Sequence, residues 1–304
     1  MYEYAIQTAG LTKYYGRRRG ILDVSIQVPT GSIYGFLGPN GAGKTTMIRL
    51  LLGFLRPSSG VAYIGGFDVR RQSLDVRENV GYLPGEIRFF NHLTGYRTVA
   101  YLSRLRGTDC RQRAAFLARK LDLDLNLKVR YCSRGMRQKL GLIQAMMHDP
   151  AVLILDEPTN SLDPLMQQQV YDLLRDYAAT GGTVFFSSHI ISEVERICDR
   201  AAIIRDGQLV ADDAIAELRK RSIQHVRLVL KDNSQLPSPL PDGMRLVGQK
   251  GQDVYLIVEG SAEILQRLLR SIEVDYISIE PPSLEEVFLR FYRKVETEDE
   301  RQTA

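Results

Sequence analysis

Cysteine is scarce in this chain of 304 residues, and its three cysteines, Cys110, Cys132 and Cys198, lie far apart. An odd and widely spaced set argues against a disulfide framework, and it lacks the spacing of metal ligands. We therefore expect that the chain works in a reducing compartment.

Long apolar runs and strong charge are also absent. No stretch approaches the length of a membrane span, and residues 1–10 lack the charged and apolar parts of a signal peptide. Any membrane role is therefore expected to come through a partner. The formal net charge is only +4, and the basic clusters at residues 17–19 and 219–221 are short. Such clusters are typical of solvated surface, so we expect no nucleic-acid partner.

The composition is that of a globular protein, with 44% hydrophobic and 25% charged residues. A chain of this length can bury one large core, or a core plus a smaller domain. The sequence shows no internal repeat and no low-complexity tract, so the question of function rests on its motifs.

Strand-like and helical patterns alternate from about residue 21 to residue 205, which predicts a parallel sheet covered by helices. Three continuous apolar segments are predicted strands of this sheet: residues 32–38, 151–156 and 182–189. Residues 43–55 have helical spacing and predict a helix that Pro57 stops.

Two other regions are predicted to be helical. Asp163 is the expected N-cap of a helix whose first residue is Pro164 and which stops at Gly181. Residues 91–127 repeat apolar residues at helical spacing, which predicts a helical lobe beside the sheet.

The composition changes after about residue 220. Residues 231–244 hold three prolines and predict a loop between two strands. The predicted elements are strands at 225–230, 253–260 and 274–280, a helix at 262–272 and a last helix from residue 281, followed by a frayed polar tail at 295–304. In the last helix Ser283 and Glu286 have capping-box spacing. We expect residues 222–304 to form a small α+β domain with no chemical motif of its own.

The segment GPNGAGKTT has the spacing of a phosphate-binding loop and lies between a predicted strand and a predicted helix. Its glycines, Gly38, Gly41 and Gly43, let backbone N–H groups point at phosphates, and the following helix adds its positive N-terminus. Lys44 supplies a point charge for the terminal phosphates, and the Thr45 hydroxyl is suited to bind Mg²⁺.

Asp156 and Glu157 stand side by side at the end of a predicted buried strand. Neighbouring side chains on a strand point to opposite faces, so the two acids cannot share one partner. Taken alone, the pair is equally consistent with an acidic turn. However, ligands of an open parallel sheet lie beyond the C-terminal ends of its strands. We therefore predict that Asp156 faces the Mg²⁺ on Thr45 and that Glu157 holds the water that attacks the terminal phosphate.

Four motifs in this order resemble the ATP-binding cassette (ABC) transporter ATPases: GPNGAGKTT (Walker A), RGMRQKLGL (signature), LILDEPTNSLDP (Walker B with D-loop) and SSH (H-loop). The resemblance covers about residues 6–213, and residues 278–292 are similar to the end of cassettes from the drug, antibiotic and toxin export branch. It implies an α/β P-loop ATPase cassette in residues 1–221, with a parallel-sheet core, an antiparallel β edge and a helical lobe. The small C-terminal α+β domain would follow in residues 222–304.

The resemblance also implies a site for ATP and Mg²⁺. Glu157 and His189 are the implied catalytic residues, His189 being a switch histidine that contacts the terminal phosphate, and Thr45 and Asp156 are the implied metal ligands. The implied ATP contacts are Tyr15, Gly38, Asn40, Gly41, Gly43, Lys44, Thr45 and Thr46. Tyr15 would stack on adenine, and Tyr14 remains a rival for that role.

In such ATPases two cassettes close head to tail around two ATP molecules. The implied contacts to the ATP of the partner are Ser133 and Gly135 of the signature, with Ser133 capping a helix that runs to about Met147. Asp163 matches the D-loop position that relays between subunits. The resemblance thus implies a homodimer or a paired cassette.

The other implied partner is a separate transmembrane permease, which would hold the chain at the cytoplasmic face of the membrane. Its docking surface would be the lobe at residues 91–127 and the loop around Gly85. The family pattern usually has a glutamine at that position, and either Glu86 replaces it or Gly85 is an ordinary loop residue.

The signature also departs from the family pattern, because Cys132, Arg134 and Met136 replace the familiar Leu, Gly and Gln. Ser133 and Gly135 are retained, so we expect their phosphate contacts to survive.

The leading hypothesis is therefore the ATP-hydrolysing subunit of an ABC exporter. One alternative is a soluble ABC ATPase that acts on ribosomes or DNA, but the chain has one phosphate loop and no heptad run. A second alternative is a nucleotide-dependent regulatory module that hydrolyses little, which Gly85 motivates. Glu157 and His189 argue against it.

Overall fold

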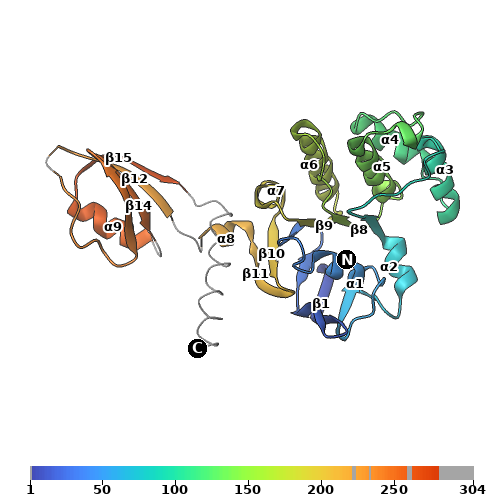
Figure 1. Cartoon of the computed structure of the whole chain (residues 1–304), viewed down its shortest axis with the longest axis horizontal. Coiled ribbons are helices and arrows are strands. Elements are labelled where there is room, and N and C mark those ends of the chain that lie inside the picture. Colours follow the sequence, from blue (N-terminus) through green and yellow to red (C-terminus); the bar gives the residue numbers. More distant parts are fainter. Residues whose placement is uncertain (1, 221–223, 233, 259–261, 281–304) are drawn as a thin grey trace. The chain divides into compact units, whose positions relative to one another are not determined.

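The computed structural model describes residues 2–220, 224–232, 234–258 and 262–280 of the chain (Figure 1). The chain divides into two compact units, Met1–Asp212 and Asp213–Ala304. The first unit carries the four motifs that the sequence analysis singled out.

A six-stranded sheet runs through the first unit in the strand order β11-β10-β4-β9-β8-β7 (Figure 1). The bounds are β4 Ile33–Leu37, β7 Val80–Leu83, β8 Val152–Asp156, β9 Thr183–Ser188, β10 Arg200–Arg205 and β11 Gln208–Ala214. The strands from β10 to β7 pair in parallel. Every residue of β4, β8 and β9 is buried, so both faces of the sheet are covered and the three predicted strands are confirmed.

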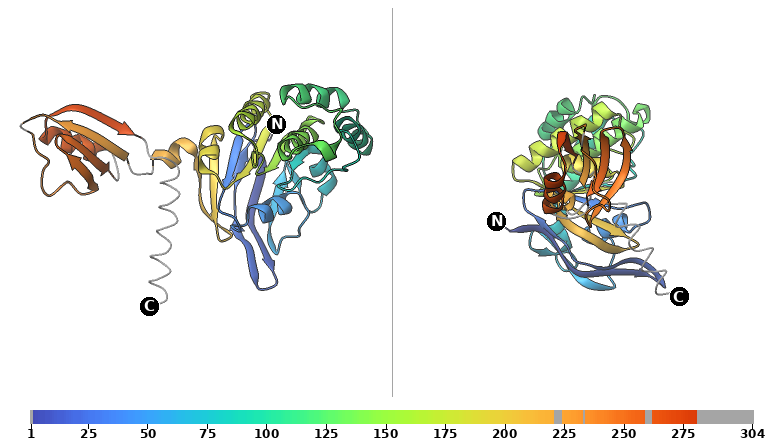
Figure 2. Two further views of the ribbon diagram at one scale, coloured as in Figure 1. Left: turned by 45° about the horizontal axis from the view of Figure 1, so that its top comes forward. Right: turned by 90° about the vertical axis from the view of Figure 1, so that its left-hand side faces the viewer.

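An antiparallel sheet forms the second layer of this unit. Its strands are β1 Tyr4–Tyr15, β2 Arg18–Val24, β3 Gln27–Pro29, β5 Ser59–Ile64 and β6 Phe67–Asp68. β1 pairs with β2, β3 and β5, and the β1–β2 hairpin is the long blue ribbon of Figure 2. This sheet confirms the antiparallel edge that the resemblance implied.

Helix α1 Lys44–Leu51 follows β4 and contributes to the core between the two sheets. Met47 and Ile48 are fully buried there, together with Phe36 and Phe185, whose ring centroids lie 5.3 Å apart. The same core includes residues from both sheets, so the start of α1 is held firmly at the end of β4.

The predicted end of this helix at Pro57 is wrong. α1 ends at Leu51 because Gly53 adopts the left-handed conformation, with φ of 68°, that terminates helices. The N–H of Phe54 then donates to the carbonyl of Arg49 at 2.8 Å and satisfies one of the last turn's acceptors.

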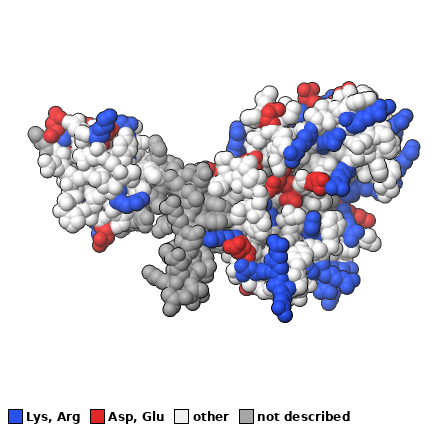
Figure 3. All heavy atoms as spheres, viewed as in Figure 1, with Lys and Arg blue, Asp and Glu red and all other residues white. Residues whose placement is uncertain are grey.

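The helical lobe contains α3 Gly95–Arg106, α4 Arg111–Lys120 and α5 Arg134–Met146. They gather beside the sheet at the upper right of Figure 1. α3 and α4 are the helices expected within residues 91–127, and α5, which lies outside that range, joins them in the lobe. On the face shown in Figure 3, Lys and Arg side chains are frequent over this lobe, and the last turns of α3 and α4 carry Arg104, Arg106, Arg119 and Lys120.

The remaining helices of the first unit are α2 Ser73–Asn79, α6 Pro164–Ala179 and α7 Ile191–Ile197. The predicted bounds of α6 are confirmed: the Asp163 carboxylate accepts the N–H of Met166 at 2.9 Å, and Gly181, with φ of 93°, follows the last turn.

The second unit is a four-stranded antiparallel sheet in the order β13-β14-β12-β15. Its elements are α8 Ile215–Lys220, β12 Gln224–Leu230, β13 Met244–Lys250, β14 Asp253–Val258, α9 Ala262–Ser271 and β15 Val274–Glu280. Leu265 and Leu268 of α9 join a core with the buried residues of β12 and β14. Strand β13 escaped prediction because most of its residues are exposed and its pairing has a bulge, so no alternation marks it. The last helix and polar tail predicted beyond residue 280 lie outside the described residues.

In the part of the chain that the structure describes, no helix is both long and apolar enough to cross a membrane. Cys110, Cys132 and Cys198 are free thiols.

His148 generates a prediction about stability. Its Nε2 lies 3.3 Å from the carbonyl of Val80, and burial, with the nearby Arg106 charge, lowers its pKa to about 4. The unfolded chain, with a histidine pKa of about 6.5, therefore binds a proton that the native state does not bind. We expect the free energy of unfolding to fall as the pH falls from about 6.5 to about 4.

Denaturant unfolding of wild type and His148→Gln at several pH values in this window measures the contribution. The variant is expected to lose stability less steeply on acidification. Equal slopes for the two proteins would contradict the prediction.

Candidate functional site

The phosphate loop connects the end of β4 to α1. Gly43 has φ of 111°, and a Cβ there would lie 2.9 Å from the carbonyl oxygen of Gly20. A Cβ on Gly38 would lie 2.5 Å from the carbonyl oxygen of Ile204. Both positions therefore require glycine, and the close packing brings the loop against the neighbouring segments.

Lys44 is only 5% exposed, and its Nζ donates to the carbonyl oxygens of Gly38 at 2.7 Å and Pro39 at 3.2 Å. Its Nζ also lies 3.4 Å from Glu157 Oε1. Burial lowers the pKa of Lys44, and the charges of Glu157 and Asp156 oppose that effect. The ammonium group thus contacts carbonyl oxygens of its own loop and the carboxylate of Glu157. A phosphate can replace these partners.

Asp156 is the last residue of β8 and is 6% exposed. Its Oδ2 accepts the hydroxyl hydrogen of Thr45 at 3.3 Å, and its Oδ1 accepts that of Ser187 at 2.7 Å. Both carboxylate oxygens are therefore oriented, one of them toward the phosphate loop. Ser187 was not predicted as a site residue; its place in the SSH motif, two residues before His189, was the available signal in the sequence.

Glu157 follows directly but points to different partners. Its φ of 51° is in the left-handed region, which turns the chain sharply after the strand. Its Oε1 lies 3.1 Å from Nδ1 of His189 as well as near Lys44, and its Oε2 accepts from Asn160 Nδ2 at 3.3 Å. The two adjacent acids therefore have separate partners.

A cavity of about 390 Å³ opens beside the phosphate loop. Its lining includes Tyr15, Asn40, Gly41, Gly43, Lys44, Thr45, Thr46 and Glu157, all of them predicted site residues, and also Arg18, Arg19, Gly20 and Arg49. Arg18 and Arg19 were assigned to solvated surface. They line the cavity because the hairpin pairs Arg18 with Tyr15.

A second cavity, of about 430 Å³, is lined by Thr45, Arg49, Tyr82, Pro84, Gly85, Glu86, Asp156 and Glu157. A hydroxyl and a carboxylate oxygen are ligands that Mg²⁺ takes together with phosphate oxygens and water, so Thr45 and Asp156 fit this ion. Among the described residues no group of three or more His, Cys, Asp or Glu is arranged to hold a metal. The protein alone therefore offers a partial coordination shell.

Gly85 lies beside this partial shell, since a Cβ there would be 3.5 Å from Asp156 Oδ2. The carboxylate of Glu86 is instead paired with Arg88 at 2.9 Å, and its side chain is 78% exposed. In this arrangement the partner of Glu86 is Arg88, and not the Thr45–Asp156 pair where Mg²⁺ would bind.

The signature and D-loop residues lie outside both cavity linings. Ser133 caps α5, its hydroxyl accepting the N–H of Met136 at 3.2 Å. A Cβ on Gly135 would contact Leu162 and Met166, so the start of α5 lies against the D-loop and the start of α6, which Asp163 caps.

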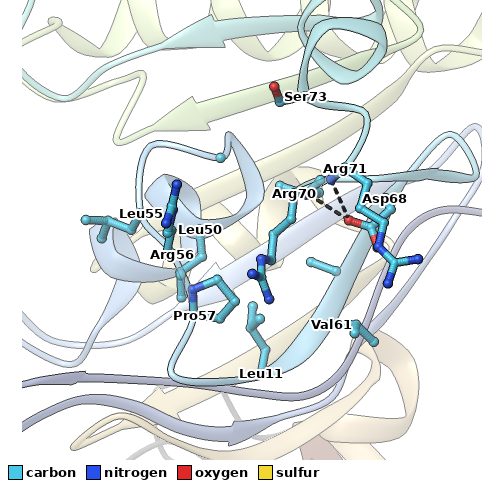
Figure 4. Close-up of a pocket in the computed structure, with 13 residues that line it drawn as sticks. Leu11, Leu50, Leu55, Arg56, Pro57, Val61, Asp68, Arg70, Arg71 and Ser73 are labelled. Carbon is cyan, nitrogen blue, oxygen red and sulfur yellow. Dashed lines mark hydrogen bonds between the residues drawn. The ribbon is translucent and has the colours of Figure 1, made fainter.

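A different cavity, of about 480 Å³, lies between the end of α1, the middle of β5 and the segment that follows β6 (Figure 4). Its lining includes Arg56, Arg70, Arg71 and the acid Asp68. The Asp68 carboxylate accepts the backbone N–H groups of Arg70 at 2.8 Å and Arg71 at 3.0 Å. The bond from Arg71 is the main reason that the pKa of Asp68 is lowered. None of the predicted site residues lines this cavity, so it is separate from the phosphate loop.

A phosphate loop at the C-terminal ends of parallel strands, next to two acids with separate partners, defines a P-loop nucleotide-binding protein. Residues 21–160 match the family model described as ABC transporter. The chain is 31% identical over 294 residues to the bacitracin transport ATP-binding protein BcrA of Enterococcus faecalis, covering 94% of this chain and 96% of that protein. It is 32% identical over 305 residues to the daunorubicin resistance ATP-binding protein DrrA3 of Streptomyces coeruleorubidus, covering 95% and 96%.

A solved structure described as the ATP-binding subunit of an ABC transporter matches with a TM-score of 0.67 and 26% identity, covering 71% of this chain and 92% of that one. The chain belongs to the family of ABC transporter ATP-binding proteins, whose members are ATPases coupled to transport. It is an ATP-binding subunit similar to those of the drug and antibiotic export branch. The predicted family and fold are thereby confirmed.

The two tyrosines at the end of β1 generate a prediction. Tyr15 lines the cavity beside the phosphate loop and Tyr14 does not, although their exposures are similar at 44% and 41%. Tyr15→Ala is therefore expected to weaken ATP binding by about 1 to 3 kcal/mol, the worth of a base stacked on a ring. Tyr14→Ala is the matched control, and both are measured by titration of the nucleotide. A greater loss in the control would assign the stacking role to Tyr14.

Proposed function

We propose that this chain hydrolyses MgATP through Glu157 and His189 and thereby drives a separate exporter permease. The observation that carries the proposal is the contact of Glu157 with both Lys44 and His189, at 3.4 Å and 3.1 Å, beside the cavity of the phosphate loop. An acid, a histidine and a buried ammonium group meet there, where the terminal phosphate of ATP would lie.

The residues divide the chemistry among them. Backbone N–H groups of the phosphate loop and the Lys44 ammonium bind the phosphates, so Lys44 exchanges its contact with Glu157 for one with phosphate. The freed carboxylate of Glu157 orients the attacking water and accepts its proton, while His189 contacts the terminal phosphate. Thr45 and Asp156 would hold Mg²⁺, which supplies charge neutralisation between the phosphates when bound.

A second cassette would complete the site. Ser133 and Gly135 lie outside the lining of this chain's own cavity, and the N-terminus of the 13-residue helix α5 suits an anion. We therefore infer a head-to-tail pair, identical or not, in which each signature meets the ATP of the other subunit and Asp163 lies at the junction. The cassette would span residues 1–221, and residues 222–304 would form an accessory domain.

Glu157→Gln tests the hydrolysis step. The variant keeps the shape of the side chain but cannot accept a proton, so hydrolysis is expected to fall by about 10² to 10⁴-fold. ATP affinity should be retained or increased, because Lys44 loses a competing charge, and the protein should remain paired in the presence of ATP. Phosphate release, nucleotide titration and light scattering measure the three quantities. Equal turnover in wild type and variant would reject the assignment of Glu157.

A groove between the sheet and the helical lobe is the proposed permease contact. Its volume is about 280 Å³, and it is lined by residues that include Leu52, Phe54, Tyr82, Leu102, Leu105 and His148. Phe54 is 56% and Leu105 is 67% exposed, and both line this one groove, so the groove presents clustered apolar surface of the kind that docking sites use. An amphipathic helix of the permease fits such a groove. Docking there would hold the chain at the cytoplasmic membrane face.

Leu105→Glu tests the docking surface, with Leu74→Glu as its matched control. Leu74 is 72% exposed but does not line the groove. Coexpression with a neighbouring reading frame of about six membrane spans is expected to give copurification of wild type and control, but not of Leu105→Glu. ATP binding should be unchanged in all three. Copurification of Leu105→Glu at the wild-type level would remove the groove from the proposal.

A further inference from the structure

Glu193 is a buried acid to which the proposed hydrolysis step assigns no role. It lies in the first turn of α7 and is only 6% exposed. Its Oε1 accepts the hydroxyl hydrogen of Thr159 at 2.6 Å, and its Oε2 accepts that of Ser188 at 2.7 Å. A buried carboxylate is costly without such bonds, so its two partners are the reason that it is tolerated.

These two partners belong to the two loops that carry the catalytic pair. Thr159 follows Glu157 by two residues, and Ser188 directly precedes His189. The hydroxyl oxygen of Ser188 also accepts the N–H of Ile190 at 2.9 Å, so Ser188 bridges the backbone on both sides of His189. Thr159 and Ser188 are each 2% exposed, and water therefore does not compete for these bonds.

The charge of the same carboxylate also acts on Tyr171 of α6. Tyr171 is 1% exposed, and burial raises its pKa, with a further rise from the charge of Glu193. Through its hydrogen bonds the carboxylate joins α7 to the loops after β8 and β9.

We infer that Glu193 is a positioning residue that fixes the position of the loop after β8 relative to the loop after β9. In this arrangement Oε1 of Glu157 lies 3.1 Å from Nδ1 of His189. The role requires a carboxylate, because each hydroxyl donates one hydrogen and only a carboxylate accepts through both of its oxygens. A glutamine has one acceptor oxygen, so one of the two bonds must be lost or reversed.

The inference rests on the proposed function for its kinetic test. Glu193→Gln and Thr159→Val are expected to lower kcat by about 10 to 100-fold, as small misplacements of catalytic groups do. ATP affinity should be unchanged, because the phosphate loop is not altered. Thr159→Ser restores the hydroxyl and should restore kcat, and Ser192→Ala, an exposed change in the same turn as Glu193, is the matched control.

A parallel loss of ATP affinity and kcat in Thr159→Val would indicate a merely structural role and would overturn the inference. Unchanged kcat in both Glu193→Gln and Thr159→Val would also overturn the inference. If Glu193→Gln fails to fold, the comparison of Thr159→Val with Thr159→Ser decides.

A second measurement does not depend on hydrolysis. The chain has four histidines, and the ring signals of His189 are assigned by NMR of the full chain through their loss in His189→Gln. Glu193→Gln is expected to shift or broaden these signals while leaving those of His148 unchanged. If wild type hydrolyses no ATP, the proposed function fails, and this measurement still tests the positioning: unaltered His189 signals would overturn it.

Discussion

The ion pair between the Lys44 ammonium and the Glu157 carboxylate, 3.4 Å apart, is the interaction on which the rest of the site depends. Lys44 is almost fully buried, and a desolvated ammonium group needs an anion or several carbonyl oxygens to be tolerated. Here it has both, from its own loop and from Glu157. In the proposed function a triphosphate, which carries more negative charge than one carboxylate, replaces Glu157 as the partner of Lys44. Nucleotide binding and release of the proposed catalytic acid would then be a single exchange of partners.

A layer of buried polar residues joins the segments that flank Glu157 and His189. Ser187 orients the Asp156 carboxylate, and the two oxygens of Glu193 orient the segments around Thr159 and Ser188. Gln138 of α5 adds a link, because its Nε2 donates to the carbonyl of Pro158 at 2.8 Å and ties the signature helix to the loop after β8. Each bond lies in surroundings of low exposure, where hydrogen bonds are strong and unpaired groups are costly. The layer therefore favours one arrangement of the motif loops.

The departures from the family pattern fall where the structure leaves room for them. Around the signature, Ser133 retains its capping bond to Met136, which depends on the hydroxyl and not on the neighbouring side chains that differ. At Gly85, the missing side chain leaves the space next to Asp156 open. Neither departure lies in the phosphate loop or at Asp156 and Glu157, which agrees with the place of the chain among transport ATPases.

The sequence by itself determined the family, the parallel strands, the capped start of α6 and the identity of the motif residues, because these depend on local spacing and on apolar periodicity. It did not determine the end of α1, which the left-handed Gly53 decides, nor the edge strand β13, whose exposed residues leave no pattern. Only the tertiary structure brought Arg18 to the cavity beside the phosphate loop and showed Ser187 and Glu193 bonded to the segments around Glu157 and His189. Such contacts join segments far apart in the chain, and hydroxyl or carboxylate groups have no periodicity that announces their partners. Local sequence patterns therefore determine the helices and strands, and the packing of these elements against each other determines the partners of each polar group.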